Sequence, residues 1–240
     1  MYPAGSPLAA VSEKGSESGE YATLIVFVLL ILASVSALDW ASASCMADAI
    51  GVLNAGSSSL KFSLFAQEAG RPGLVARGQA EGLYTSPRFV AKNSAGEVLD
   101  EKTWPAGAPL GHDGALEYLM GFVRGRLAQH RLIGVGHRVV HGGREFVKPV
   151  RVDENIAAAL EKYVPLAPLH QPHNLAPIKA LLARSPELPQ IACFDTSFHR
   201  TQPTVAQAFA LPASITDRGV LRYGFHGRAR SPTCATRSTR

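Results

Sequence analysis

Residues 52–62, VLNAGSSSLKF, place a polar loop between two short apolar segments. Residues 50–53 and 60–65 are rich in β-branched and bulky side chains, which predicts a strand on each side of the loop. Gly56 lets backbone N–H groups approach an anion closely, the serines add hydroxyl donors, and Lys61 adds a positive charge. Two interpretations remain open at this point, a plain hairpin turn and a loop that holds phosphate.

The rest of the chain alternates segments with helical and strand patterns. Apolar residues recur at near-helical spacing in residues 114–131, and residues 153–163 begin with an acidic capping residue before an alanine-rich stretch. Residues 132–140 and 190–194 are apolar runs of strand length. Because strands and helices alternate and 46% of the residues are hydrophobic, the sequence predicts an α/β domain with a substantial core.

The formal net charge of +5 is distributed unevenly along the chain. Residues 1–45 have a net charge of −3, and residues 228–240, with four arginines and no acidic residue, have one of +4. Residues 46–227 therefore have a mild basic excess of +4. A nucleic-acid-binding protein usually has a denser basic stripe, so we expect a small anionic ligand and no nucleic acid. The three cysteines are far apart and lack CxxC spacing, which favours a reducing, cytoplasmic location over a disulfide framework or a zinc site.

Residues 21–38 contain no charged side chain and reach the lower end of the length needed to span a membrane. Three interpretations are open: a single-pass anchor, a signal peptide, or translated sequence upstream of the true start. Three glutamates before this segment outnumber Lys14, which is unlike a secretory signal. We favour upstream sequence, because Met46 would open the first strand of an ordinary cytoplasmic domain. A membrane partner is expected only if residues 21–38 are retained.

Arg138 lies in the segment GHRVVHGG, on a predicted strand that leads into a Gly-Gly turn. A permanently charged guanidinium that can bond bidentately is suited to clamp a carboxylate or a phosphate, and the alternative is a surface salt bridge. His137 and His141 flank this strand, but an i, i+4 pair on a strand is too widely spaced for a compact metal chelate.

Three further segments carry polar residues between Gly or Pro residues. Residues 165–174 are expected to form a rigid loop, in which His170 either donates to an oxyanion or satisfies backbone carbonyls. Asp195 follows an apolar run and would either position a nucleophile or a Mg²⁺-bound water, or cap a helix. His226 stands beside Gly227 in YGFHG, which fits close approach to a ligand or only a turn.

Five segments together resemble the acetate kinase family, with propionate and butyrate kinases as relatives, over residues 47–227. The segments are VLNAGSSSLKFSLF, GHRVVHGG, LAPLHQPHN, CFDTSFHRTQP and YGFHG, in the order of the family. Gln171 replaces a commoner asparagine, and Ser197 a commoner alanine. The resemblance implies the actin-like α/β fold of sugar kinases and heat-shock ATPases, in which two domains close on a cleft. It also implies transfer of the γ-phosphoryl group of ATP to acetate, or another short-chain carboxylate, giving acetyl phosphate and ADP.

At the phosphate end of the site, the resemblance assigns Asn54 to the metal-bound phosphates of ATP, with Mg²⁺ or Mn²⁺ as the metal. Ser57, Ser59 and Lys61 would lie beside it as nucleotide-binding residues.

At the acyl end, the resemblance assigns Arg138 to the carboxylate or its phosphate. Val140 and Leu169 would line a small apolar pocket. Catalytic roles fall to three residues that contact the transferred phosphoryl group, the metal or the nucleophile, namely His170, His226 and Asp195.

The resemblance also divides the chain. Residues 1–45 form an extension outside the family, residues 46–197 the amino-terminal domain, residues 198–227 the start of a truncated second domain, and residues 228–240 an aberrant basic tail. The family continues YGFHG with Thr-Ser-His and a second domain, so we expect negligible kinase activity from this chain alone. The intact form would be a cytoplasmic homodimer. The alternatives are a membrane-anchored, non-catalytic anion-binding module and the product of a disrupted reading frame.

Overall fold

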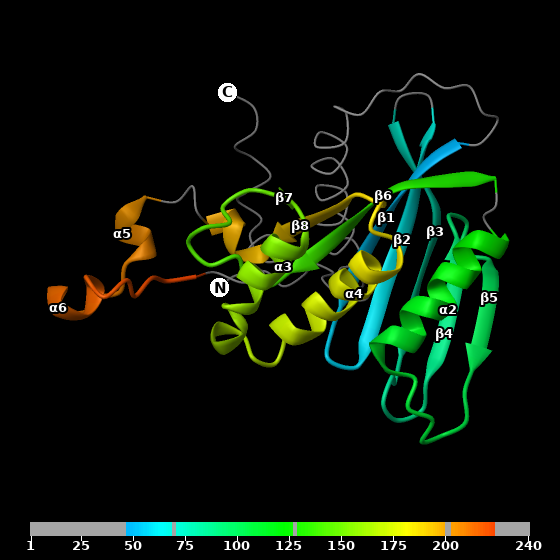
Figure 1. Ribbon diagram of the computed structural model, residues 1–240, viewed down its shortest axis with the longest axis horizontal. Helices are drawn as coiled ribbons and strands as arrows, with labels where there is room; N and C mark the ends of the chain where they lie inside the picture. The colour runs from blue at the N-terminus through cyan, green and yellow to red at the C-terminus, as the bar shows by residue number, and fades with distance from the viewer. Residues whose placement is uncertain (1–46, 69–70, 127–128, 200–202, 224–240) are drawn as a thin grey trace, which may run out of the picture.

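The computed structural model describes residues 47–68, 71–126, 129–199 and 203–223, and its centre is an eight-stranded mixed sheet (Figure 1). The strand order is β5-β4-β3-β2-β1-β6-β8-β7. The strands are β1 (Ala47–Ala55), β2 (Ser59–Glu68), β3 (Arg71–Glu81), β4 (Arg88–Asn93), β5 (Val98–Thr103), β6 (His130–Val139), β7 (Val150–Arg151) and β8 (Gln190–Phe194). Strands β1 to β5 pair antiparallel, whereas β1, β6 and β8 are parallel.

The three longest described helices cover one face of this sheet (Figure 1). They are α2 (Gly111–Arg126), α3 (Glu154–Glu161) and α4 (Gln171–Arg184). The shorter turns are η1 (Val164–Leu166), η2 (Asp195–His199), α5 (Thr204–Gln207) and α6 (Ala213–Thr216). Helices α5 and α6 extend away from the sheet (Figure 1). None of the helices in the described ranges is long and apolar enough to cross a membrane.

The core lies between the sheet and these helices. Phe62 of β2 and Phe89 of β4 stack with ring centroids 5.6 Å apart, and Phe122 of α2 contacts both rings. Towards β8, the fully buried Leu160 of α3 and Ile178 of α4 pack against strand residues. Burial of such side chains is worth about 1.5–3 kcal/mol each, so this layer fixes the helices on the sheet.

The opposite face of the sheet is also apolar. Its buried cluster consists of strand residues, namely Ile50, Val52, Phe65, Ile191 and Cys193, with Leu74 and Ile133 partly buried beside them. Among the described residues, no helix contributes to this cluster. We call it the second face.

The structure confirms the strands predicted on either side of the loop after Leu53 and the strand over 190–194. It also confirms a capped helix, because Asp153 accepts a hydrogen bond from the backbone N–H of Ile156 at 2.8 Å. The helix predicted over 114–131 ends earlier, at Arg126, and β6 begins at His130.

The rigid loop predicted over 165–174 is wrong in its second half, since α4 begins at Gln171. Pro172 occupies the first turn of α4, where a backbone N–H is not needed for helical hydrogen bonds. Strands β3, β4 and β5 were not predicted. Residues 1–45, with the segment 21–38, and residues 228–240 lie outside the described residues.

Candidate active site

Polar residues from three strands gather at the carboxyl ends of β1, β6 and β8, which we call the carboxyl edge. Asn54 of β1 is paired in register with Lys61 of β2, so both side chains share one face of the sheet. Leu53 pairs with His137, which places Arg138 on the same face as Asn54. Asp195 follows β8 directly. In sheets with parallel strands, ligands bind outside these carboxyl ends.

Arg138 and Asp195 form a bidentate ion pair at this edge. Nε of Arg138 donates to Oδ1 of Asp195 at 3.0 Å, and Nη2 donates to Oδ2 at 2.9 Å. The Arg138 side chain is 27% exposed and that of Asp195 is 10% exposed. The pair therefore fixes the plane of the guanidinium while leaving part of it accessible to an anion from solvent.

The loop between β1 and β2 makes a tight turn, in which the backbone N–H of Gly56 donates to the carbonyl of Ser59 at 2.8 Å. Ser57 and Lys61 are exposed and Ser59 is half-buried. The hydroxyls and the ammonium group are thus presented to solvent at the carboxyl edge, as an anion-binding loop requires.

Two buried side chains hold this loop from the helical face. Asn174 of α4 donates from Nδ2 to the carbonyl of Ala55 at 2.6 Å, and its Oδ1 accepts from the backbone N–H of Val140 at 2.9 Å. Nε2 of His112, at the start of α2, lies 2.7 Å from the carbonyl of Gly56. Asn174 therefore links the end of β1 to the residues that follow Arg138.

The ring of His112 is fixed on both sides. Because a carbonyl only accepts, Nε2 carries the proton, and Nδ1 accepts from the hydroxyl of Tyr84 at 2.9 Å. His173 of α4 stacks on His112 at 5.3 Å. Burial, together with the neighbouring His112 and His170, lowers the pKa of His173. Sequence reasoning missed His112, Tyr84 and Asn174, since nothing near them in the chain indicates these contacts.

The turn after β6 is also held by side chains from other elements. Gln171, fully buried, accepts from the backbone N–H of His141 at 3.1 Å and donates to the carbonyl of the same residue at 2.9 Å. Oγ1 of Thr196, in η2, accepts from the backbone N–H of Gly142 at 3.0 Å. Buried backbone groups need such partners, so this turn has a single well-bonded conformation.

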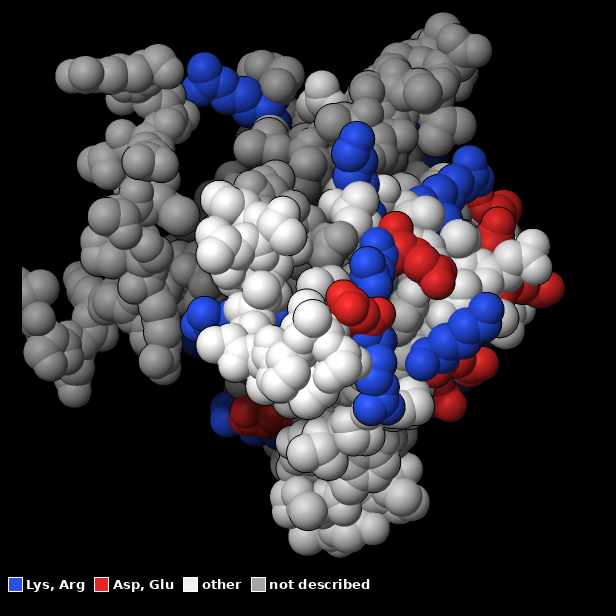
Figure 2. All heavy atoms as spheres, turned by 90° about the vertical axis from the view of Figure 1, so that its left-hand side faces the viewer, with Lys and Arg blue, Asp and Glu red and all other residues white. Residues whose placement is uncertain are grey.

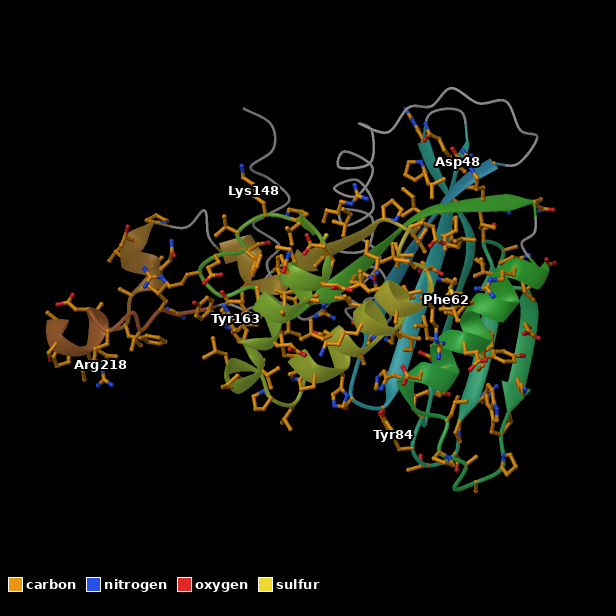
Figure 3. The ribbon with its side chains drawn as sticks, viewed as in Figure 1. Asp48, Phe62, Tyr84, Lys148, Tyr163 and Arg218 are labelled. Atoms are coloured by element: carbon orange, nitrogen blue, oxygen red, sulfur yellow. The ribbon has the colours of Figure 1, made fainter. Side chains whose placement is uncertain are left out.

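Gly143 closes this turn with a φ of +61°, and a Cβ at this position would lie 2.1 Å from the ring of Tyr163. Only glycine fits both the left-handed backbone and the space. The ring of Tyr163, labelled in Figure 3, thereby packs directly on the turn that follows Arg138.

Comparison with known proteins shows the family of this chain. Residues 49–236 match the family model described as the acetokinase family. The chain belongs to the acetokinase family. The match extends past Gly227, where the sequence resemblance ended.

The acetokinase relatives include an acetate kinase from Rhodopseudomonas palustris, 48% identical over 184 residues, which cover 76% of this chain and 46% of the relative. An acetate kinase from Rhizobium meliloti is 44% identical, with 75% and 46% covered. Solved structures of a Francisella tularensis propionate kinase and a Porphyromonas gingivalis acetate kinase each give a TM-score of 0.65 at 33% identity. They cover 75% of this chain, which in turn covers 45% and 46% of them. The actin-like α/β fold is thus shown, and the chain spans less than half the length of these relatives.

The other residues predicted for the site lie just before α4, directly after β6, or outside the described residues. His170 is the exposed residue that precedes α4, and Leu169 beside it is 74% exposed. Val140 is half-buried. No described residue encloses Leu169 as a pocket wall. His226 lies outside the described residues.

Proposed function

We propose that the carboxyl edge binds the acyl substrate and the phosphoryl group in an acetate kinase-type phosphotransferase. The reaction is reversible transfer of the γ-phosphoryl group of ATP to acetate, or another short-chain carboxylate, giving acetyl phosphate and ADP. The observation that carries this proposal is the Arg138–Asp195 pair, which shares a face of the sheet with Asn54 and Lys61. A guanidinium that can hold a carboxylate or phosphate, beside a loop suited to phosphate, matches the groups of an acyl phosphate.

The chemistry is an in-line displacement at phosphorus. One carboxylate oxygen forms a bond to the γ-phosphorus, while the bond to the oxygen that bridges the β- and γ-phosphates breaks and its electrons stay with ADP. Such a reaction depends on positioning and charge stabilisation. Arg138 holds the negative charge of the substrate, and Asp195 fixes the orientation of the guanidinium.

The loop residues Ser57, Ser59 and Lys61 serve the phosphates of ATP. His170 and His226 would donate to the transferred phosphoryl group, and Val140 and Leu169 would contact the methyl group. The exposure of Leu169 leaves this last contact to be completed by residues other than the described ones.

A divalent metal fits the donors at this edge. Mg²⁺ or Mn²⁺ prefers oxygen ligands, and Asn54 and Asp195 supply an amide oxygen and a carboxylate. The described residues contain no group of three or more His, Cys, Asp or Glu side chains that would hold a metal without substrate. Mg²⁺ commonly binds through one or two carboxylates, with waters and substrate phosphates as its other ligands. When bound, the metal would neutralise phosphate charge.

The whole-protein properties belong to the same proposal. We assign residues 46–197 to the amino-terminal domain and 198–227 to the start of the second domain, and residues 1–45 precede the family match. A cytoplasmic homodimer is the proposed intact form, and no nucleic acid is a partner. On the face that Figure 2 shows, the described Lys and Arg side chains lie among Asp and Glu side chains.

Titration of the 240-residue chain with acetyl phosphate, followed by calorimetry, tests the proposal. Arg138→Ala should weaken binding about 10- to 100-fold, because a hydrogen bond to a charged group is worth about 1.5–3 kcal/mol. Arg131→Ala is the matched control, since Arg131 lies on the same strand and pairs with Asp48 at the other end. Equal losses in both variants would contradict the proposal. In a coupled ADP-release assay, the 240-residue chain alone should show negligible turnover.

A further inference from the structure

The turn after β6, residues 140–146, ties the end of that strand to the residues that follow β8. The backbone N–H of Gly142 donates to Oγ1 of Thr196 at 3.0 Å. Thr196 is the neighbour in sequence of Asp195, which pairs with Arg138. A shift of this turn would therefore change how the guanidinium and the carboxylate meet.

The side chain of His141 holds the turn from within. It is 2% exposed, and its Nδ1 accepts from the backbone N–H of Gly143 at 2.9 Å. Burial lowers the pKa of His141, so the ring is neutral at neutral pH and Nδ1 can accept. An apolar side chain at this position would leave the buried N–H of Gly143 without its partner, which is costly.

Two tyrosine rings pack on the ring of His141. Tyr163, between α3 and η1, stacks on it with ring centroids 5.8 Å apart. Tyr223 contacts it with centroids 4.6 Å apart and the ring planes tilted by 60°. His141 is thus held between a residue of the amino-terminal domain and a residue of the segment that we assign to the second domain.

The segment that ends at Tyr223 meets the same turn at another point. Figure 1 shows the chain after α6 running back towards the sheet. A Cβ at Gly219 would lie 3.1 Å from Nη1 of Arg144, so the backbone passes close to a side chain of the turn. The backbone N–H of Arg222 donates to the carbonyl of Gln207 at 2.8 Å. Tyr223 therefore belongs to a bonded segment that packs on the turn.

We propose that His141 positions Arg138 and Val140 for the acyl substrate and takes its own position from Tyr223. This inference rests on the proposed function, which assigns those two residues to the substrate. Arg138 lies on the second face, where it pairs in register with Cys193, and its direction depends on the turn that ends β6. His141 is buried, so it acts through the backbone of the turn and does not touch the substrate.

Calorimetric titration of the 240-residue chain with acetyl phosphate tests the hydrogen bond. His141→Phe keeps a ring between the tyrosines but removes the acceptor, and should weaken binding about 10-fold because the N–H of Gly143 loses its partner. His141→Asn should bind within about 3-fold of the unsubstituted chain, because an asparagine oxygen can accept from the N–H two residues further on. A role in stability alone would lower the free energy of unfolding of His141→Phe and leave the dissociation constant of the folded protein unchanged.

Variants at Tyr223 test the second contact. Tyr223→Ala should weaken the binding of acetyl phosphate about 5-fold, because the ring pair with His141 is lost. Tyr223→Phe keeps the ring and should bind like the unsubstituted chain. Phe209→Ala is the matched control, since Phe209 lies on the same segment and is 47% exposed. Equal affinities in Tyr223→Ala and Phe209→Ala overturn the part played by Tyr223.

The unsubstituted chain separates two kinds of failure. If it does not bind acetyl phosphate, the proposed function is contradicted, and with it the positioning role of His141. If it binds and His141→Phe binds equally well, only the positioning role is overturned. A loss in His141→Phe that His141→Asn restores, together with a loss in Tyr223→Ala, supports it.

Discussion

The two ends of β6 carry the same kind of ion pair in different surroundings. Arg131 donates to Asp48 at 2.7 Å at the start of the strand, and Arg138 donates to Asp195 at 2.9 Å at its end. Arg131 is 50% exposed, whereas Arg138 is 27% exposed. Figure 3 shows Asp48 and Tyr84 at opposite ends of the sheet, with Tyr84 beside the carboxyl edge. Donor–acceptor distance alone therefore does not distinguish a binding group from a surface pair.

The surroundings make the difference. Near Arg138, buried Gln171, Asn174 and Thr196 bond the backbone of the adjacent turn. Near Arg131, a backbone bond from Ala47 to Gln129 joins the strand ends. Surface ion pairs are solvated and add little to stability. An ion pair beside a turn that buried side chains hold by hydrogen bonds keeps its geometry for a ligand.

The largest expected effect on the free energy of unfolding comes from a substitution at Gly143, in the turn that follows β6. Gly143→Ala should lower the free energy of unfolding by about 3 kcal/mol, from a strained left-handed backbone and a clash with Tyr163. Gly96→Ala is the control, because Gly96 also has a positive φ but no atom within 4 Å of the added Cβ. It should cost about 1 kcal/mol. Urea unfolding measures both, and equal costs would show that the contact with Tyr163 is unimportant.

Buried His137, near the end of β6, should make the free energy of unfolding depend on pH. Burial lowers the pKa of His137 from its ordinary 6.5 to about 4, and the neighbouring Gln190 only partly offsets this. The unfolded chain binds a proton more readily, so stability is full above pH 6.5 and falls as the pH drops towards 4. The loss should reach about 2 kcal/mol at pH 5. His137→Leu should flatten this part of the profile, and an unchanged slope would exclude His137 as its origin.

A smaller effect separates the two ion pairs directly. A double-mutant cycle on Arg138 and Asp195 should give a coupling free energy of about 1–2 kcal/mol, because the pair is bidentate and largely buried. The same cycle on Arg131 and Asp48 should give a coupling near the detection limit of the unfolding measurement. If the two couplings agree, burial at the carboxyl edge does not strengthen the pair.

The smallest effect concerns the hydrogen bonds from Tyr84 to His112 and from His112 to the loop between β1 and β2. Tyr84→Phe removes the hydroxyl that donates to Nδ1 of His112 and should lower stability by about 0.5–1 kcal/mol. Amide hydrogen exchange at the Gly56 and Ser59 turn should become faster, since His112 holds the carbonyl of Gly56. Unchanged exchange would mean that Asn174 alone fixes the loop.

The sequence predicted the elements whose signals are local. The strands around the serine loop and the Asp153-capped helix follow from apolar runs and a capping residue. Strands β3 to β5 were missed because their outer residues are charged and exposed, as in β5, VLDEKT. The start of α4 was missed because Pro172 indicates a loop as readily as a first helical turn.

The site was predictable where one motif carries the chemistry. Arg138 and Asp195 were both chosen from their own motifs, but their ion pair joins residues 57 positions apart. The link from His112 to Gly56 spans 56 positions, and the link from Asn174 to Ala55 spans 119. Only the fold brings such residues together, so a single sequence cannot indicate the hydrogen bonds by which His112 and Asn174 hold the loop between β1 and β2.

Amide chemical-shift mapping with acetyl phosphate tests the central claim most directly. If the carboxyl edge binds the acyl phosphate, shifts should concentrate at Asn54, the Gly56–Ser59 turn, the Arg138–Gly143 segment and Asp195, and should disappear in Arg138→Ala. The Asp48 and Arg131 end of the sheet should not shift. Shifts that are strongest at that end, or that persist in Arg138→Ala, would contradict the claim.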